Sequence, residues 1–319
     1  MDGLGNKLKD YGKLKTSESL AKHTSFKIGG LARFFVSPDT LEKHVELMRY
    51  LDGIGVPYMM LGGGSNMLAG DNGFDGVVIH PEYQKIFQEG TTLIADAGAL
   101  TVTVARESMK YQLAGFEWGV GIPGSIGGAV RGNAGAMGFE MKDSVLRVQA
   151  YRDGEVVMLT NEQCEFGYRS SIFKRKGSVV LQVTLQLEAT QNKELIKHAL
   201  EYLTYRNSTQ PQGHASTGCI FQNPDAGKYR TQLIEHFDKY SEKVQSFLSL
   251  GKISAGWLIE QAGLKGEQVG NALISEQHGN FIVNLGGATA ADVHRLIDKV
   301  KETVYTKFGI TLEEEIHTF

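Results

Sequence analysis

The sequence predicts an α+β protein of three small units, and three observations lead to this fold class. Its 319 residues are about twice the ~150 that one domain usually takes. Patterns typical of strands and of helices follow one another along the chain without an internal repeat. Glycine contributes 39 residues, well above the usual ~7 per hundred, and clusters in two loops. With 41% hydrophobic and 22% charged residues, the composition excludes a disordered or fibrous chain.

Charge, apolar runs and cysteines limit the compartment and the partners. The formal net charge is −3, so we expect no broad basic surface for nucleic acid or an anionic membrane. No stretch approaches the ~18 apolar residues of a membrane span, and residues 1–20 lack the apolar core of a secretory signal. Two cysteines cannot build a disulfide framework. We therefore expect a cytoplasmic protein, and a monomer because no coiled-coil pattern or apolar patch suggests assembly.

The first two units are expected at residues 21–85 and 86–206, after an N-terminal extension of residues 1–20. In the first, Ser37-Pro38-Asp39 predicts the capped start of an amphipathic helix to about Leu51. Its remaining elements are a strand over residues 56–61, the loop Gly62–Asn66 and a strand over residues 77–79. In the second, the expected elements are a strand (92–97), a helix (102–111), a glycine-rich segment (115–138), a hairpin of strands 145–151 and 156–159 with the turn Asp153-Gly154, a strand with one largely polar face (179–187) and a helix (195–203).

The third unit is expected at residues 207–319, after a boundary rich in Ser, Thr, Gln, Pro and Gly at residues 207–215. It alternates a helix (254–262), a strand (281–284), a helix (289–308) and a terminal strand (310–319). Three adjacent carboxylates, Glu313-Glu314-Glu315, are unusual in a strand. Alternation places Glu314 on the apolar face and Glu313 and Glu315 on the other. Either the strand is a solvated edge, or it projects a carboxylate into a cleft.

The segment Gly119-Val120-Gly121-Ile122-Pro123-Gly124 matches the pattern G-x-G-x-x-G of dinucleotide-binding Rossmann folds. That motif needs a strand before it and a helix after it, whose N-terminus binds the pyrophosphate. Pro123 removes one amide donor, and residues 125–138 contain too much glycine for the required helix. The sequence therefore argues against a Rossmann fold.

Two glycine loops, Gly62–Asn66 and Gly121–Gly138, instead suggest a clamp for a diphosphate. Successive glycines let backbone N–H groups approach a phosphate closely. Ser65, Asn66 and Asn133, together with Thr24-Ser25, add polar side chains to these loops. Tight turns between short strands are the alternative interpretation. Two separate loops with these polar residues favour a dinucleotide.

Two further residues are candidates for chemistry, each with an ordinary structural alternative. Arg169 lies among hydroxyl groups in Tyr168–Lys174, and a guanidinium suits bidentate binding of carboxylate or phosphate. A surface salt bridge explains it at least as well. A lone cysteine such as Cys219 is usually a small buried hydrophobe, and a cysteine hydrolase would need a histidine partner that is not evident. The nine histidines show no metal-binding spacing, so no metal is expected.

Taken together, the motifs resemble those of a known family over residues 23–319. The matching segments are His23-Thr24-Ser25-Phe26-Lys27-Ile28-Gly29-Gly30, Leu61-Gly62-Gly63-Gly64-Ser65-Asn66, Gly121-Ile122-Pro123-Gly124-Ser125-Ile126-Gly127-Gly128-Ala129, Asn133-Ala134-Gly135, Tyr168-Arg169-Ser170-Ser171-Ile172-Phe173-Lys174 and Asn280-Phe281-Ile282-Val283-Asn284. In this order they resemble the UDP-N-acetylenolpyruvoylglucosamine reductase (MurB) family of peptidoglycan precursor synthesis. Ser254–Glu260 and the lack of a long tyrosine-bearing insertion resemble its shorter subtype.

The resemblance implies a two-part FAD-binding domain of the PCMH type, followed by a smaller α/β substrate-binding domain whose last strand returns to the active site. It implies non-covalent FAD, NADPH as hydride donor and a UDP-sugar substrate. Together with the glycine loops, it marks as cofactor-binding Thr24, Ser25, Gly62, Gly63, Gly64, Ser65, Asn66, Gly121, Ile122, Gly124, Ser125, Gly127, Gly128 and Asn133.

The resemblance also implies roles for substrate-side residues. Arg169 matches an arginine that binds the substrate carboxylate, and Glu315 matches the carboxylate of a C-terminal Glu-Val motif, which must be protonated to donate. Cys219 falls where the family has a proton-donating serine. A thiol, with a reference pKa of ~8.5, is a stronger acid than a hydroxyl and can fill that role. Tyr168 and Asn223 are expected to contact substrate.

Two departures and two rival functions complete the sequence reading. His317 replaces an arginine and Met137 a tyrosine of the family pattern, without a consequence that we can assign. One rival is a flavin oxidase or dehydrogenase on the same scaffold with another substrate. The other is a nucleotide-sugar binding protein without turnover, although a pure binder needs no proton donor.

Overall fold

A computed structural model describes residues 2–175, 177–191 and 194–319. The chain divides into two compact units, and neither is continuous in sequence. Unit 1 comprises the residues up to Glu18, Leu31–Gly64 and Phe74–Ser208, whereas unit 2 comprises Ser19–Gly30, Ser65–Gly73 and Thr209–Phe319. The boundary at Ser208 lies near the one expected after residue 206. The segment expected as a first unit, residues 21–85, is shared by both.

The first sheet of unit 1 has the strand order β1-β2-β5-β3, with β2, β5 and β3 mutually parallel. Its strands are β1 (Lys13–Ser19), β2 (Leu31–Ser37), β5 (Phe74–Ile79) and β3 (Tyr58–Met60). Helix α2 (Leu41–Ile54) follows β2, and Thr40 caps it by accepting the Lys43 N–H at 3.2 Å. The start predicted at Ser37 was therefore three residues early, because Thr40 provides the capping hydroxyl.

The N-terminal extension is part of the core of unit 1. It folds as α1 (Asp2–Leu8), a 3₁₀ turn η1 (Lys9–Tyr11) and β1. Leu8 and Tyr11 are buried in one apolar cluster with Leu47, Met48 and Leu51 of α2. No role was predicted for residues 1–20, and their packing shows that they cover this helix.

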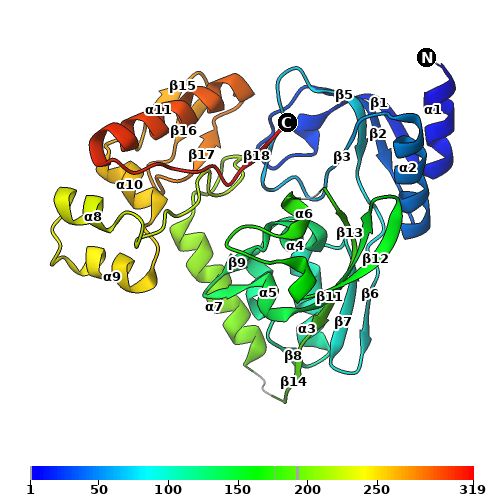
Figure 1. Cartoon of the computed structure of the whole chain (residues 1–319), viewed down its shortest axis with the longest axis horizontal. Helices are drawn as coiled ribbons and strands as arrows, with labels where there is room; N and C mark the ends of the chain where they lie inside the picture. Colours follow the sequence, from blue (N-terminus) through cyan, green and yellow to red (C-terminus); the bar gives the residue numbers. More distant parts are fainter. Residues whose placement is uncertain (1, 176, 192–193) are drawn as a thin grey trace. The chain divides into compact units, whose positions relative to one another are not determined.

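The second sheet of unit 1 is antiparallel throughout, in the order β12-β11-β13-β7-β6 (Figure 1). Its strands are β6 (Ile86–Glu89), β7 (Thr92–Asp96), β11 (Val145–Arg152), β12 (Glu155–Thr160) and β13 (Val179–Gln186). The predicted hairpin is confirmed, with Asp153 and Gly154 at φ 51° and 84° in its turn. The buried face predicted for β13 is confirmed at Leu181, Val183 and Leu185, which are fully buried. The face predicted as largely polar is exposed at Gln186 but buried at Val180 and Thr184, which are 7% and 5% exposed, because β13 is a central strand of the sheet.

Helix α3 (Thr101–Lys110) agrees with its prediction, but α4 (Ile126–Gly132) corrects another. The glycine-rich segment was expected to form no helix. It forms two turns because Ser125 caps the helix, with Oγ accepting the Gly128 N–H at 3.4 Å, and Asn133 ends it with φ 42°. The helix packs against β13 and β7 (Figure 1), and a Cβ on Gly127 would lie 2.8 Å from the Cβ of Ala97. Tertiary contact thus stabilises a helix that propensity disfavours.

Short elements and one long helix complete unit 1. They are β8 (Leu113–Ala114) paired with β14 (Glu188–Ala189), η3 (Glu117–Gly121), β9 (Gly135–Ala136) paired with β10 (Phe139–Glu140), α5 (Met141–Ser144), η4 (Glu162–Cys164) and α6 (Ile172–Arg175). Helix α7 (Leu195–Thr209) agrees with the predicted helical stripe and extends into the segment expected as a linker. None of the helices in the described ranges has both the length and the apolar character needed to cross a bilayer.

Unit 2 is built on an antiparallel sheet of β15 (Gln268–Val269), β16 (Ala272–Ile274) and β17 (Ile282–Asn284). The long helix α11 (Ala290–Phe308) lies along it and buries Val293, Leu296 and Val300 (Figure 1). The predictions for β17, α10 (Ala255–Gln261) and α11 are confirmed within a residue or two. The helices α8 (Arg230–His236) and α9 (Glu242–Leu250) and the short turn η2 (Leu20–Lys22) were not predicted.

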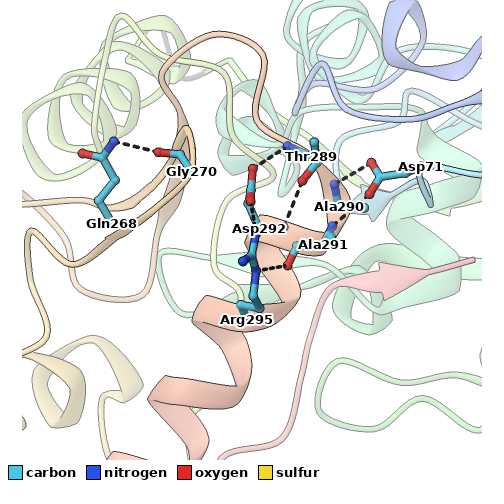
Figure 2. A network of polar contacts seen from close by, with 8 residues as sticks. All are labelled: Asp71, Gln268, Gly270, Thr289, Ala290, Ala291, Asp292 and Arg295. Carbon is cyan, nitrogen blue, oxygen red and sulfur yellow. Dashed lines mark hydrogen bonds and ion pairs between the residues drawn. The ribbon is translucent and has the colours of Figure 1, made fainter.

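The segment that follows the first glycine loop belongs to unit 2. Within it, β4 (Met67–Leu68) pairs in parallel with β18 (His317–Thr318). The carboxylate of Asp71 accepts the backbone N–H groups of Ala290 and Ala291 at 2.8 and 3.0 Å, at the start of α11 (Figure 2). An anion at a helix N-terminus is favourable, so Asp71 fastens this segment to the longest helix of the unit.

The continuous terminal strand predicted over residues 310–319 was wrong. Only His317–Thr318 form a strand, and a single bridge joins Glu314 to Phe221. The segment changes partner along its length, from residues 220–222 to residues 66–68, so no continuous ladder can form. The alternation itself is confirmed by burial, since Ile310, Leu312 and Ile316 are at most 6% exposed.

Candidate active site

The two glycine loops contact each other within unit 1. A Cβ on Gly63 would lie 2.4 Å from the Cα of Gly124, and a Cβ on Gly62 would lie 2.4 Å from the Oγ of Ser125. Gly64 and Gly124 adopt φ of 61° and 93°, a region that favours glycine. Close approach and backbone conformation therefore both require glycine here.

These loops carry backbone donors that the protein itself leaves unused. Among the described residues, no acceptor takes the backbone N–H of Gly62, Gly63, Gly124 or Ser125. Ser125 is only 5% exposed, and a buried N–H without an acceptor is uncommon in a folded protein. An anion across the two loops would satisfy these donors, which fits the phosphates of a dinucleotide.

The start of α4 cannot serve in the way of a Rossmann helix. Its first three N–H groups are bonded within the protein, from Ile126 to Ala99 O at 2.8 Å, from Gly127 to Ala97 O at 3.0 Å and from Gly128 to Ser125 Oγ. The adjoining sheet is antiparallel, whereas a Rossmann sheet is parallel. The expectation against a Rossmann fold is confirmed, although the argument that no helix follows the motif was wrong.

The other predicted residues of these loops differ in surroundings. Gly127 is required by its packing on Ala97, whereas a Cβ at Gly121 or Gly128 would meet only ordinary contacts of 3.5 Å. Ile122 is buried beside them, with 8% of its surface exposed. Packing within the chain therefore does not require glycine at Gly121 or Gly128.

Arg169 occupies a strained position in a tight turn of unit 1. Gly167 and Ser170 exchange two backbone hydrogen bonds of 2.9 and 3.1 Å, which leaves Tyr168 and Arg169 as the two central residues. Arg169 has φ 52°, where glycine is normally found. Its Nη2 donates to Gly135 O at 3.2 Å, and its guanidinium lies 5.3 Å from the centre of the Tyr168 ring. Strain of this kind is most often retained where a side chain must be presented in one direction.

Asn133 lies beneath this turn. It is fully buried, its Nδ2 donates to Gly167 O at 2.9 Å and to Glu140 Oε2 at 3.1 Å, and its Oδ1 accepts from the Lys142 N–H at 3.0 Å. The carboxamide therefore links the end of α4 to the turn that carries Arg169. Its contacts are those of a supporting residue.

In unit 2, Cys219 and Glu315 lie on adjacent hydrogen-bonded segments. The Glu315 N–H donates to Ile220 O at 2.8 Å, and the Gln222 N–H donates to Glu313 O at 2.8 Å. A bridge on the other side of the same segment pairs Cys219 with Phe281. Both side chains are half-buried. The structure thus places Cys219 and Glu315, which lie almost a hundred positions apart in the sequence, on neighbouring hydrogen-bonded segments.

The other two glutamates of the acidic triplet and the second cysteine are weaker candidates for chemistry than Glu315 and Cys219. Glu314 forms an ion pair with Lys301 at 2.9 Å, and Glu313 is exposed. Cys164 is fully buried, and burial raises the pKa of its thiol to about 12, so it is unreactive near neutral pH.

The remaining predicted residues of unit 2 form hydrogen bonds to the backbone. Asn223 Oδ1 accepts the Ala255 N–H at 3.0 Å at the start of α10. Ser25 Oγ donates to Ser216 O at 2.7 Å, and Thr24, which is 1% exposed, donates to Ile28 O at 3.1 Å. Asn66 Nδ2 donates to Glu315 O at 3.2 Å. In these contacts the four side chains fix loops, and Asn66 fixes the loop that bears Glu315.

Two buried asparagines of unit 2 were not predicted as site residues, although both lie in the motif that resembles the family. Asn280 and Asn284 are 2% and 6% exposed, and both bond to backbone groups of neighbouring segments. The available signal was two asparagines at the ends of a predicted buried strand, where asparagine is depleted. Within the described ranges, no cluster of three or more His, Cys, Asp or Glu side chains could hold a metal ion.

Unit 1 has two glycine loops in contact and a turn that carries Arg169, and unit 2 carries Cys219 and Glu315 on neighbouring segments. These features agree with the class of protein that two family models define. The FAD binding domain model matches residues 32–160, and the model of the UDP-N-acetylenolpyruvoylglucosamine reductase C-terminal domain matches residues 210–319. The chain is thus an FAD-dependent oxidoreductase.

Relatives and a solved structure give the family. The chain is 40% identical over 315 residues to UDP-N-acetylenolpyruvoylglucosamine reductase of Anoxybacillus flavithermus, covering 96% of this chain and 94% of that protein. It is 38% identical to the reductase of that name from Bacillus subtilis, over 97% and 95% of the two chains. The crystal structure of UDP-N-acetylenolpyruvylglucosamine reductase from Thermus caldophilus superposes with a TM-score of 0.76 at 32% identity, covering 96% and 98%. The chain belongs to the UDP-N-acetylenolpyruvoylglucosamine reductase (MurB) family.

Proposed function

We propose that the protein reduces UDP-N-acetylenolpyruvoylglucosamine to UDP-N-acetylmuramate, with FAD bound non-covalently and NADPH as hydride donor, in peptidoglycan precursor synthesis. The observation that carries this proposal is the family relationship, which extends over 96% of the chain at 40% identity. The placement of Cys219 and Glu315 on neighbouring hydrogen-bonded segments supports it, because both are candidate proton donors and a protein that only binds a nucleotide sugar needs none. A cytoplasmic monomer acting on a soluble UDP-sugar, without nucleic acid or membrane, is part of the same proposal.

The glycine loops of unit 1 are the residues that would hold the FAD diphosphate. The unused N–H groups of Gly62, Gly63, Gly124 and Ser125 supply donors without a competing internal acceptor. When bound, FAD supplies the hydride chemistry that no side chain of the protein can perform. The loops provide position and donors, and their direct contact makes the arrangement rigid.

Arg169 is the proposed partner of the substrate carboxylate. Hydride addition to the enolpyruvyl double bond moves negative charge onto the carboxylate conjugated with it. A guanidinium already held in place stabilises that charge without rearrangement, and such an interaction contributes roughly 3 to 4 kcal/mol in comparable sites. The turn and the Asn133 carboxamide hold Arg169 before substrate arrives, and Tyr168 and Asn223 are proposed to contact the sugar nucleotide.

Cys219 and Glu315 are the proposed proton-handling pair. After hydride addition at C3, the adjacent carbon C2 needs one proton, and the Cys219 Sγ–H is the proposed source. Glu315, when protonated, would donate a hydrogen bond to the developing enol. A thiol is acidic enough for this step and regains its proton from solvent.

The experiment is a visible absorbance measurement on the purified protein. We expect a yellow protein whose colour NADPH bleaches and the enolpyruvyl UDP-sugar restores in the absence of oxygen. Acid precipitation should release the flavin into the supernatant, since no covalent link is proposed, and NADH in parallel reports the nicotinamide preference. Colour restored by oxygen but not by the sugar would indicate another flavin oxidoreductase. A colourless protein that takes up no added FAD would refute the proposal.

A further inference from the structure

We propose that Asn280 is a positioning residue, whose buried carboxamide holds Cys219 and Glu315 in register for the reaction. It precedes β17 and is 2% exposed. The inference rests on the proposed function for its chemistry, but the geometry that carries it lies wholly within unit 2.

The Asn280 side chain forms hydrogen bonds to both backbone groups of Phe221. Its Nδ2 donates to Phe221 O at 2.8 Å, and its Oδ1 accepts the Phe221 N–H at 2.9 Å. The backbone of Asn280 adds a third bond, since its carbonyl accepts the Ile220 N–H at 2.9 Å. Residues 220 and 221, directly after Cys219, are thereby fixed against β17.

The same segment transmits this position to Glu315. Ile220 O accepts the N–H of Glu315 at 2.8 Å, while the Ile220 N–H bonds to Asn280 O. A shift of residues 220–221 would therefore move the backbone of both proposed proton-handling residues. Asn66 secures the far side of the Glu315 segment, because its Nδ2 donates to Glu315 O and its carbonyl accepts the His317 N–H at 3.1 Å.

Only a side chain with one donor and one acceptor at this spacing can replace the amide. A neutral carboxylic acid meets this requirement, because its hydroxyl donates and its carbonyl accepts. An ionised carboxylate does not, because it would face Phe221 O with a second acceptor. In Asn280→Asp the proposed role therefore predicts a rate that depends on pH, because only the neutral acid can form both hydrogen bonds. Burial at this position favours the neutral acid and raises the pKa of the introduced group.

The test measures two rates on the FAD-loaded full chain, namely bleaching by NADPH and colour recovery with the enolpyruvyl UDP-sugar. For Asn280→Asp at about pH 8, we expect recovery to slow roughly tenfold or more, as for loss of a buried hydrogen bond. Bleaching should stay near the wild-type rate. Lowering the pH to about 6 should restore the recovery rate of the variant relative to that of the wild type at the same pH. The wild type controls for other titrating groups, including His278, whose Nδ1 accepts the Asn280 N–H.

Asn284→Asp is the matched control. It introduces the same acid at the end of β17, but Asn284 bonds to Phe26 O and to the N–H groups of Gly286 and Ala288. We expect it to lower the Tm while the ratio of the two rates stays at the wild-type value at every pH. A parallel fall of both rates in Asn280→Asp, or a wild-type ratio across the pH range, would show that Asn280 is merely structural.

A second readout is independent of substrate and of the proposed function. Because Cys164 is buried, iodoacetamide should modify Cys219 alone of the two cysteines. Asn280→Ser, a smaller change that serves if the aspartate variant does not fold, should raise the alkylation rate of Cys219 several-fold by releasing its segment. An unchanged rate would overturn the inference. Failure of the wild type to recover colour with the sugar would instead overturn the proposed function and leave the alkylation result to decide this one.

Discussion

The two units hold their candidate residues in different ways. In unit 1 the backbone does the positioning, through glycines in direct contact and a turn that keeps Arg169 at φ 52°. In unit 2 side chains bond to the backbone, as the buried Asn280 does to Phe221 and the buried Asn284 to Phe26. The first arrangement uses conformations that few residues tolerate, whereas the second uses hydrogen bonds that few residues can form.

This difference determines which substitutions each unit tolerates. Positioning by the backbone is lost when a side chain is added, because the added atoms overlap with neighbours or the required φ becomes costly. A side-chain device fails when a donor or acceptor is removed, because its buried partner is left without a hydrogen bond. Three predictions follow the contrast from its largest expected effect to its smallest.

The largest effect is expected at Arg169, where function and backbone strain can be separated. Arg169→Ala and Arg169→Gly should both slow turnover of the UDP-sugar by about 10² to 10³, because both remove the guanidinium. The glycine variant should be about 1 kcal/mol more stable than the alanine variant, since it relieves the left-handed conformation. Steady-state turnover and urea unfolding measure the two effects. Equal stability of the two variants would mean that the turn carries no strain.

The next effect is expected at the contact between the glycine loops. Gly63→Ala would place its Cβ 2.4 Å from the Cα of Gly124, so we expect about 1–3 kcal/mol of destabilisation and reduced FAD content. Gly132→Ala is the matched control, because nothing lies within 4 Å of its Cβ and alanine favours a helix by about 1 kcal/mol. Thermal unfolding and the ratio of visible to ultraviolet absorbance report both quantities. Full FAD content in Gly63→Ala would show that the loops can separate without loss of binding.

The smallest effect is expected at the start of α11 in unit 2 (Figure 2). Asp292 accepts the Thr289 N–H at 3.1 Å, and this backbone hydrogen bond leads the interactions that lower the pKa of Asp292 below its usual 3.8. A carboxyl group with a lowered folded-state pKa stabilises the fold above its usual pKa and loses that effect as pH falls. Asp292→Asn should therefore be less stable by about 1 kcal/mol at pH 7, with the difference narrowing below about pH 4. A difference that stays constant in urea unfolding at both pH values would assign the effect to packing.

Local patterns were sufficient for most of the elements. The hairpin at Asp153-Gly154, the helix α11 and the strand β17 follow from turn residues and from the period of apolar residues, and each was predicted close to its observed bounds. The helices α8 and α9 were missed, because their apolar residues are few and much of their surface is exposed. No helix was predicted at α4, because its glycines disfavour one. In the structure Ser125 caps the helix and β7 packs against it.

For the candidate site, the sequence indicated the residue types but not their partners. Arg169, Cys219 and Glu315 could be selected as an arginine among hydroxyls, an isolated thiol and an acidic triplet, and a family resemblance gave them roles. The strain at Arg169 and the amide grip of Asn280 could not be found, because φ at a turn and bonds between residues 59 positions apart depend on how segments meet. Asn66 shows the same limit, since its hydrogen bond joins it to Glu315 249 positions away.

Composition and local order were enough to establish an α+β chain with glycine loops suited to phosphate, because propensity, capping and close backbone approach are properties of short segments. Long-range packing decided which glycines lie in close contact, that Glu314 of the acidic triplet is ion-paired, and which buried amide bonds to the segment that follows Cys219. Those outcomes arise when distant backbone donors and acceptors are buried together and must satisfy one another, and no short segment contains both members of such a pair.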